Sequence, residues 1–388
     1  MKWVWLVFML CLSACWVDST QGLNTVGQSS ESGLCVVVSA TEFGVSGSLS
    51  VVDAETLAVA TDLTAIHHDA LVRVSGERVF VINRQGGDSI QEIDPARGWA
   101  TLWQESVGNG VNPWDLTLLE DGTAWVPLYN SGSLLRIDTL STGSQTFVQE
   151  GPVPLPMWTD RDERVEPSAV LHHDGVLFVT VQGLDSYPSC ESDSRGYLHA
   201  FASDTLDPVL RFDGEPSLEL SACNPIDQRM LTEDILVLAH AGQFRSVVGP
   251  GATDDGGLEL VDLAAGNSLG LIASEADLGG RDVISFAIGE AGRAWVALAD
   301  YMFSVSVYSA RISEDEFSLG SSVWSSESGG IFSLGERWGR LWIADRTPGA
   351  SGVVVLDAET GEPVLDGPLD TGFAPFDIGF VDLGFPCF

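Results

Sequence analysis

Seven short hydrophobic segments recur along this chain at intervals of roughly 45 to 60 residues, and this spacing restricts the fold more than any other feature of the sequence. Each copy follows a turn and has the composition of a buried strand. The copies are residues 33–38, 78–82, 123–126, 176–179, 235–238, 293–296 and 340–343. A unit of short strands repeated in this way cannot bury its apolar faces without neighbouring units. We therefore expect a single closed array rather than several separate domains.

A second strand follows each copy, and the chain also supplies a way to close the array. The second strands are residues 47–53, 88–94, 132–138, 196–203, 257–262 and 352–357, and residues 305–312 take this place in the sixth unit. The sequence predicts an all-β fold, a seven-bladed β-propeller that spans residues 34–388.

Innermost strands are expected to begin at Pro-x-Asp segments. Three are clear and a fourth is looser: Asn112-Pro113-Trp114-Asp115, Asn224-Pro225-Ile226-Asp227, Ala374-Pro375-Phe376-Asp377 and Glu166-Pro167-Ser168-Ala169. The segment at Pro375 has no complete unit after it, and the first unit has no inner strand before it. We therefore expect residues 373–381 to pair beside Val36 and to seal the ring in a blade shared by the two termini.

These starts, with the hydrophobic strands that follow them, resemble the seven-bladed propellers of the YVTN and NHL-like repeat group. The resemblance extends over about residues 34–388. It implies the propeller fold. Because many unrelated functions use this fold, it implies little about function.

The N-terminus is expected to direct export. Residues 3–12 form a short apolar stretch after Lys2, and Leu12-Ser13-Ala14-Cys15 closes it. The stretch is too short to cross a bilayer as a helix and is typical of a signal peptide. The tetrapeptide resembles the bacterial lipobox, which implies that residues 1–15 are the signal and that Cys15 carries a lipid; the alternative is an ordinary signal with a chance cysteine.

Residues 16–33 have the composition of a flexible tether between this lipid and the propeller. We expect the protein on the outer membrane or cell surface of a Gram-negative bacterium, in contact with the membrane through its lipid alone.

Four cysteines remain after Cys11 and Cys15, and an even number in an exported chain indicates disulfides. Three pairings are possible. Because Cys35 lies on the first strand and Cys387 beside the last residue, we predict the bonds Cys35–Cys387 and Cys190–Cys223. The alternative is four free thiols.

Acidic residues dominate the charge: 55 Asp and Glu oppose 18 Lys and Arg, for a net charge of −37. Nucleic acid is excluded as a general partner, because its phosphates would be repelled. The acidic surface is explained either by solvation in a salty habitat or by the gathering of cations such as Ca²⁺.

We expect the protein to be a monomer.

The functional face is predicted from loop length. Residues 151–165, 182–195, 240–256 and 345–351 are long insertions, and all lie on the face where the innermost strands begin, here called the upper face. Polar inner-strand starts and loop aromatics on this face form the predicted binding site. Its candidates are His68, Asp69, Asn112, Asp115, Trp158, Tyr187, Arg281, Tyr301 and Asp377. The adjacent His67 and His68 are expected to point to opposite faces of an extended strand, so that they cannot chelate one ion.

Two functions are compatible with this site, and a third possibility is a subunit scaffold whose only role is assembly. The first is a non-enzymatic lipoprotein that binds a protein or a saccharide. The second is a metal-dependent hydrolase. The polar inner-strand starts surround the upper opening of the propeller's central channel, here called the channel mouth, and are similar in kind to the metal site of gluconolactonase-like propellers. In those proteins a metal-bound water and a carboxylate open a lactone. That resemblance implies Glu166, Asn224 and Asp227 as ligands of Ca²⁺ or another divalent ion, with Glu166 and Asp282 as the catalytic candidates.

Overall fold

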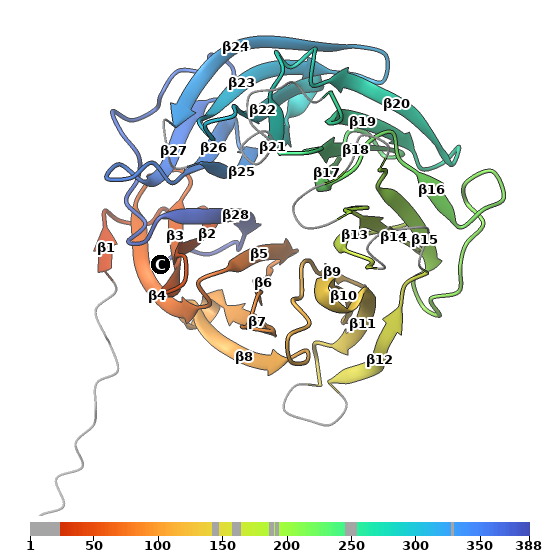
Figure 1. The fold of residues 1–388 in the computed structure, drawn as a ribbon. Helices are drawn as coiled ribbons and strands as arrows, with labels where there is room; N and C mark the ends of the chain where they lie inside the picture. Colours follow the sequence, from red (N-terminus) through yellow and green to blue (C-terminus); the bar gives the residue numbers. More distant parts are fainter. Residues whose placement is uncertain are drawn as a thin grey trace, which may run out of the picture.

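Seven antiparallel sheets surround a central axis in the computed structural model, which describes residues 24–141, 147–156, 164–185, 190, 194–244, 254–326 and 330–388 (Figure 1). The predicted seven-bladed propeller is confirmed. Every strand pairing between named strands is antiparallel, and each blade runs from an innermost strand at the axis to an outer strand at the rim.

The blades follow one another in chain order. Blade 1 consists of β28 (Pro375–Asp382), β2 (Leu34–Glu42), β3 (Ser46–Asp53), β4 (Val59–Ile66) and β1 (Asn24–Val26). Blade 2 consists of β5 (Ala70–Ser75), β6 (Arg78–Asn83), β7 (Ser89–Asp94) and β8 (Ala100–Ser106). Blade 3 consists of β9 (Thr117–Leu118), β10 (Thr123–Leu128), β11 (Ser133–Asp138) and β12 (Val148–Pro154). Blade 4 consists of β13 (Pro167–His173), β14 (Val176–Val181), β15 (Tyr197–Ala202) and β16 (Ser217–Glu219).

The remaining blades have the same design. Blade 5 consists of β17 (Pro225–Met230), β18 (Ile235–His240), β19 (Gly257–Asp262) and β20 (Asn267–Ser274). Blade 6 consists of β21 (Asp282–Ile288), β22 (Arg293–Ala299), β23 (Val305–Ile312) and β24 (Phe317–Ser326). Blade 7 has three strands, β25 (Ile331–Arg337), β26 (Arg340–Asp345) and β27 (Gly352–Asp357). Three short 3₁₀ turns are described, η1 (Pro95–Arg97), η2 (Tyr129–Ser131) and η3 (Glu290–Gly292).

The second strand of each blade forms the core, as the hydrophobic copies predicted. β14 and β18 are buried at every position, because each lies inside its own sheet and between two neighbouring sheets. Apolar side chains of adjacent blades interlock there, so the core is a ring of clusters around the axis.

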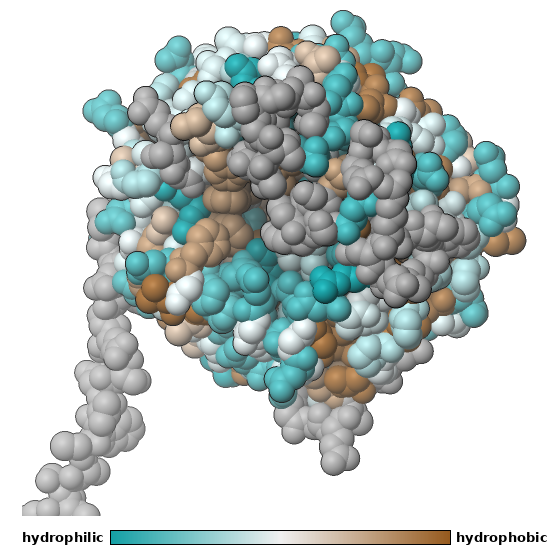
Figure 2. Space-filling view, viewed as in Figure 1, coloured by the Kyte–Doolittle hydropathy of each residue, from teal (hydrophilic) through white to brown (hydrophobic). Residues whose placement is uncertain are grey.

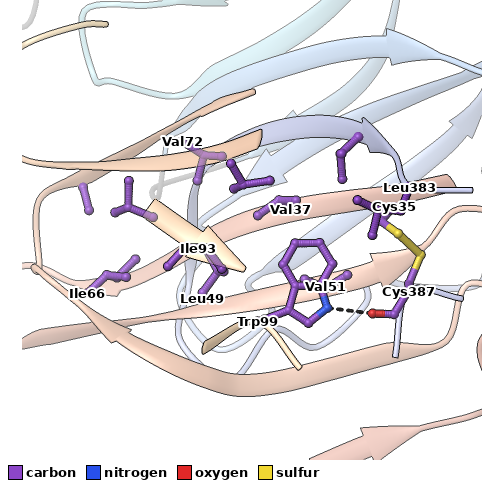
Figure 3. Close-up of a cluster of buried hydrophobic side chains, with 14 residues drawn as sticks. Cys35, Val37, Leu49, Val51, Ile66, Val72, Ile93, Trp99, Leu383 and Cys387 are labelled. Carbon is purple, nitrogen blue, oxygen red and sulfur yellow. Dashed lines mark hydrogen bonds between the residues drawn. A yellow bond between two sulfur atoms is a disulfide. The ribbon is translucent and has the colours of Figure 1, made fainter. Parts of the chain in front are cut away.

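Blade 1 closes the ring by pairing the two ends of the chain, as predicted. β28 is antiparallel to β2, with Val36 opposite Phe380. The predicted Cys35–Cys387 disulfide joins the lower ends of these strands over a sequence separation of 352 residues. Trp99 of blade 2 packs beside it, and its Nε1 donates to the carbonyl of Cys387 at 2.6 Å (Figure 3).

The upper end of the same junction is held by Arg346. Its guanidinium donates to Thr41 Oγ1 and to the carbonyls of Thr41, Ala374 and Pro375, at 2.8 to 3.2 Å. Burial lowers the pKa of Arg346 to about 10. A disulfide at the lower end and a half-buried arginine at the upper end therefore fix the shared blade.

The segment before β2 is built into blade 1, although the sequence placed it in the tether. β1 pairs with the outer strand β4, with Val26 opposite Val59. Asp53 then secures the residues between β1 and β2: its Oδ2 accepts from Ser29 Oγ and from the N–H and Oγ of Ser30, at 2.7 to 2.8 Å. Residues 24–33 of the expected tether are thus attached to blade 1, the first three as a strand and the rest through the hydrogen bonds of Ser29 and Ser30 to Asp53.

The second predicted disulfide, Cys190–Cys223, is also present and buried. It ties residue 190, in the segment between β14 and β15, to the residue that precedes Asn224. Cys15 lies outside the described residues. Within the described ranges, the fold contains no helix that is long and apolar enough to span a bilayer.

The carboxyl of Asp53 makes the stability of the fold depend on pH in the acidic range. Burial raises its pKa, but hydrogen bonds from Thr56, Ser30 and Ser29 outweigh that effect and lower it from 3.8 to about 2. The lowered pKa contributes stability that is present above pH 3.8 and lost as the pH falls through 2. We expect Asp53→Asn to reduce the free energy of unfolding at pH 7 by about 2 kcal/mol, measured by urea denaturation.

Asp357 provides a matched control, because the sequence Asp-Ala-Glu-Thr occurs at both 53–56 and 357–360. Its Oδ1 accepts from Glu359 and Thr360 as Asp53 Oδ1 accepts from Glu55 and Thr56. The described contacts of Asp357 include no counterpart of Ser29 and Ser30. Asp357→Asn should therefore cause a much smaller loss, and equal losses in the two variants would show that the N-terminal segment adds nothing.

Candidate functional site

The central channel opens on the upper face into a cavity of about 980 Å³. Its wall is made by the starts of the innermost strands and by loops between second and third strands, as the sequence predicted for the functional face. The charged, amide and serine side chains of the lining are Asp69, Arg73, Arg84, Gln85, Asn112, Asp115, Asn130, Arg164, Ser168, Gln182, Asn224, Asp227, Gln228, Arg229, Ser285, Ser333 and Asp377. Figure 2 shows the hollow at the centre of the molecule, next to teal side chains over β5.

The asparagines of the two Asn-Pro starts shape the loops around this cavity. Asn112 and Asn224 have left-handed backbones, with φ of 54° and 55°. Asn112 Oδ1 accepts from the N–H of Gln85 at 2.9 Å, and Asn224 Nδ2 donates to the carbonyl of Gly242 at 3.0 Å. Asparagine tolerates this backbone and bonds locally. Both side chains therefore hold a neighbouring loop, in addition to lining the cavity.

The aspartates of the three Pro-x-Asp starts each link their own blade to the following one. Asp377 of blade 1 accepts from the N–H of Val72 in blade 2 at 3.0 Å, and Asp115 of blade 3 accepts from the N–H of Val170 in blade 4 at 2.9 Å. Asp227 of blade 5 accepts from Ser285 Oγ of blade 6 at 3.3 Å. The repeated Asp thus has a structural role that follows from its position: one carboxylate satisfies a group on the adjacent innermost strand.

Arg73 connects two of these carboxylates across blade 2. It lies on β5, with Asp115 on one side and Asp377 on the other, and its Nη1 is 3.0 Å from Asp377 Oδ2. Because both carboxylates face it, the pKa of Arg73 is raised against the opposing effect of burial. About a third of its side chain, 35%, remains open to the channel.

A second arginine, Arg84, is fixed by charge and by aromatic rings. Its guanidinium forms an ion pair with Asp69 and lies 4.3 Å from the ring centroid of Trp114. Trp114 also stacks on Tyr129, at a centroid distance of 4.4 Å. A guanidinium held in this way keeps its orientation, which is what selective hydrogen bonding requires.

Asp227 lies in the cavity wall in surroundings that change the acidity of its carboxyl. Burial raises the pKa of its carboxyl, and Arg229 opposes that rise, with Nη1 2.6 Å from Asp227 Oδ1. A carboxyl with a raised pKa exchanges its proton at a higher pH than an ordinary aspartate does, and the neighbouring guanidinium can stabilise negative charge.

The structure brings six of the predicted site residues to the cavity: Asp69, Asn112, Asp115, Asn224, Asp227 and Asp377. Other predicted residues are not among those that line it. Glu166 directly precedes β13 and Asp282 is the first residue of β21, and both are buried. Arg281 places its guanidinium 5.3 Å from the ring of Tyr308, and Tyr301 is half exposed on a loop. Trp158 and Tyr187 lie outside the described residues.

The histidine pair differs from expectation. His67 and His68 precede β5 rather than lying on it, so strand alternation does not separate them. Their ring centroids are 4.0 Å apart. Burial and the neighbouring His68 together lower the pKa of His67, which favours a neutral ring.

The described part of the chain contains no group of three or more His, Cys, Asp or Glu side chains placed to hold a metal ion. Of the predicted ligands, Asp227 faces Arg229, and the amide of Asn224 donates to a carbonyl. The divalent-ion site at Glu166, Asn224 and Asp227 therefore stays a prediction from the sequence.

Sequence reasoning did not predict the arginines or the aromatic side chains that line the cavity. It placed one guanidinium there, Arg281, whereas Arg73, Arg84, Arg164 and Arg229 line it. Strand alternation contained the signal for Arg73, because Asp69, Leu71 and Arg73 share one face of the innermost strand.

Comparison with known proteins supports the fold. No family model matches the chain, and no curated protein matches it. Among solved structures, a Bacteroides fragilis protein provisionally named a 6-phosphogluconolactonase is similar, with 13% identity, a TM-score of 0.63 and coverage of 90% of this chain and 98% of the other. The periplasmic gluconolactonase PpgL of Pseudomonas aeruginosa is 14% identical, with a TM-score of 0.61 and coverage of 90% and 99%. At such identities the likeness shows the propeller fold alone.

Proposed function

We propose that this protein binds a small neutral polyhydroxylated molecule, of the saccharide class, in the mouth of its central channel. The observation that carries the proposal is the charge balance of the cavity: among its described lining residues, four carboxylates accompany four guanidinium groups, in a chain of net charge −37. The carboxylates are Asp69, Asp115, Asp227 and Asp377, and the guanidinium groups belong to Arg73, Arg84, Arg164 and Arg229.

This lining matches the chemistry of a sugar. Each hydroxyl both donates and accepts hydrogen bonds, so a wall that alternates donors with acceptors can satisfy several hydroxyls at once. Guanidinium groups and the amides of Gln182 and Gln228 supply donors, and carboxylates supply acceptors. Because Arg73, Arg84 and Arg229 are paired with the four carboxylates, the cavity offers a neutral ligand polar contacts without a large net field.

The test is calorimetric titration with a panel of neutral monosaccharides and disaccharides, aldonolactones and aldonate anions. We expect saturable binding of a neutral member. Arg229→Gln should weaken that binding about tenfold, which corresponds to the loss of one charge-assisted hydrogen bond. Arg97→Gln, on an exposed turn outside the cavity, should leave binding unchanged. Absence of binding across the panel, or equal affinities of native protein and Arg229→Gln, would overturn the proposal.

A second candidate, hydrolysis of a sugar lactone, is favoured by Asp227 and by the names of the structural neighbours. In this reading the Asp227 carboxylate acts as a general base toward water, and Arg229 stabilises the oxyanion that forms at the lactone carbonyl. Ring opening of glucono-1,5-lactone, followed by NMR, should accelerate with rising pH as Asp227 loses its proton. A rate equal to the protein-free reaction, or an unimpaired Asp227→Asn variant, would retire this candidate.

We also propose that the chain is exported and held by a lipid on Cys15, in keeping with its two disulfides. Mass spectrometry of the protein purified from membranes should show an acylated N-terminal Cys15. An unprocessed Met1 or an unmodified thiol would contradict it.

A further inference from the structure

One side of the channel mouth is aromatic, in contrast to the polar side described above. Phe43, Phe303, Phe332 and Phe376 line the cavity and form a continuous arc over blades 6, 7 and 1, here called the phenylalanine arc. Ring centroids of Phe43 and Phe376 are 5.2 Å apart, those of Phe332 and Phe376 5.5 Å, and those of Phe303 and Phe332 6.2 Å. Figure 2 shows brown side chains gathered on this side of the hollow, over β25 and β28.

The arc is held in place rather than loosely exposed. Phe43 meets Phe376 edge to face, at 81°, and the guanidinium of Arg346 lies 4.5 Å from its ring centroid. Arg346 is itself fixed by the hydrogen bonds that seal blade 1. Phe43 nevertheless leaves 49% of its surface open, although exposure of so large an apolar side chain at a cavity wall is unfavourable in water.

The polar and aromatic sides meet at Phe376. The guanidinium of Arg84, on the polar side, is 5.5 Å from the ring of Phe376. A ligand that sits against Arg84 therefore extends onto the arc if it carries a substituent directly on its polar ring. The volume of about 980 Å³ is at the upper end of the range for sites that hold drug-sized molecules, which leaves space for both parts.

We propose that the ligand of the channel mouth is an aryl-substituted saccharide, with its sugar on the polar side and its aromatic ring on the phenylalanine arc. This inference rests on the proposed function and specifies its ligand class. An aromatic ring is favoured over an alkyl chain because Phe43 meets Phe332 and Phe376 edge to face, at 80° and 81°. A ligand ring against Phe43 can form a further contact of this kind, which adds attraction to simple burial.

The test compares methyl, hexyl and phenyl β-D-glucopyranosides and the matching galactosides by calorimetry. The native protein is expected to bind the phenyl glycoside about tenfold more tightly than the methyl glycoside, and more tightly than the hexyl glycoside. Phe43→Ala should reduce the phenyl-to-methyl preference to about twofold or less while the affinity for the methyl glycoside is kept. Phe385→Ala is the matched control, because Phe385 is also exposed but does not line the cavity.

The outcomes separate the two proposals. Equal affinity for methyl and phenyl glycosides, a hexyl glycoside that binds as well as the phenyl one, or an unchanged preference in Phe43→Ala overturns the aryl inference and leaves saccharide binding intact. If no glycoside binds although the protein is folded by circular dichroism, the saccharide proposal and this inference both fail.

Discussion

Replacing Cys35 and Cys387 together with alanine is expected to destabilise the protein more than removal of its other disulfide. The bond closes a loop across the whole propeller, with a sequence separation of 352 residues, whereas Cys190–Cys223 spans 33. The entropy lost by the unfolded chain grows with the logarithm of loop length, which gives about 6 kcal/mol for the long loop and about 4 kcal/mol for the short one. Both pairs are buried, so the cavities left by the lost sulfurs are similar.

The comparison of the two double variants by urea unfolding, without reductant, therefore isolates ring closure. We expect the Cys35/Cys387 variant to lose about 2 kcal/mol more than the Cys190/Cys223 variant. The long-loop bond has a further role in the folded state, since it supports the lower end of the β2–β28 pairing against Trp99. An equal or smaller loss would mean that backbone pairing in blade 1 closes the ring without help from the disulfide.

Arg73→Ala is expected to lower the free energy of unfolding by about 2–3 kcal/mol. Removal of one partner from a buried ion pair costs more than the pair contributes, because a carboxylate stays behind without its cation. Here two carboxylates, Asp115 and Asp377, stay behind in the channel wall. The value lies at the lower end of the usual range because water reaches about a third of the Arg73 side chain, 35%.

Two further variants distinguish charge from packing. Arg73→Met keeps most of the side-chain volume and should lose nearly as much stability as Arg73→Ala. Arg97→Ala breaks a pair with Asp94 on an exposed turn, where the Arg97 side chain is 73% exposed, and should change stability by less than about 0.5 kcal/mol. A loss for Arg73→Ala no larger than that for Arg97→Ala would show that the carboxylates of the channel are satisfied without it.

The fold could be predicted from the sequence because each blade repeats the same pattern of a hydrophobic strand followed by a further strand. The hydrophobic copies appear as β2, β6, β10, β14, β18, β22 and β26, and residues 305–312 are β23, as the degenerate sixth unit required. Closure of the ring was predictable because the first unit lacks an innermost strand, whereas an extra innermost strand follows the last unit. The two cysteine pairings followed from that closure and from proximity along the chain.

The site was only partly predictable, because chain position fixes which end of a strand a residue occupies but not the direction of its side chain. Asp115, Asn224 and Asp377 begin innermost strands and therefore reach the cavity. Arg281 occupies a comparable position, yet its guanidinium lies against Tyr308 within blade 6. The bridge from Arg73 to two other blades, and the meeting of Phe43 with Phe376, join residues far apart in the sequence, so neither could be deduced from local pattern.

A crystal structure of the protein with the tightest-binding glycoside of the panel tests most directly whether this channel mouth is the functional site. We expect density for the sugar ring within hydrogen-bonding distance of Arg84 and Arg229, with its substituent against Phe43 and Phe376. Density for the glycoside at the outer rim or on the lower face, with the channel mouth filled only by water, would contradict it.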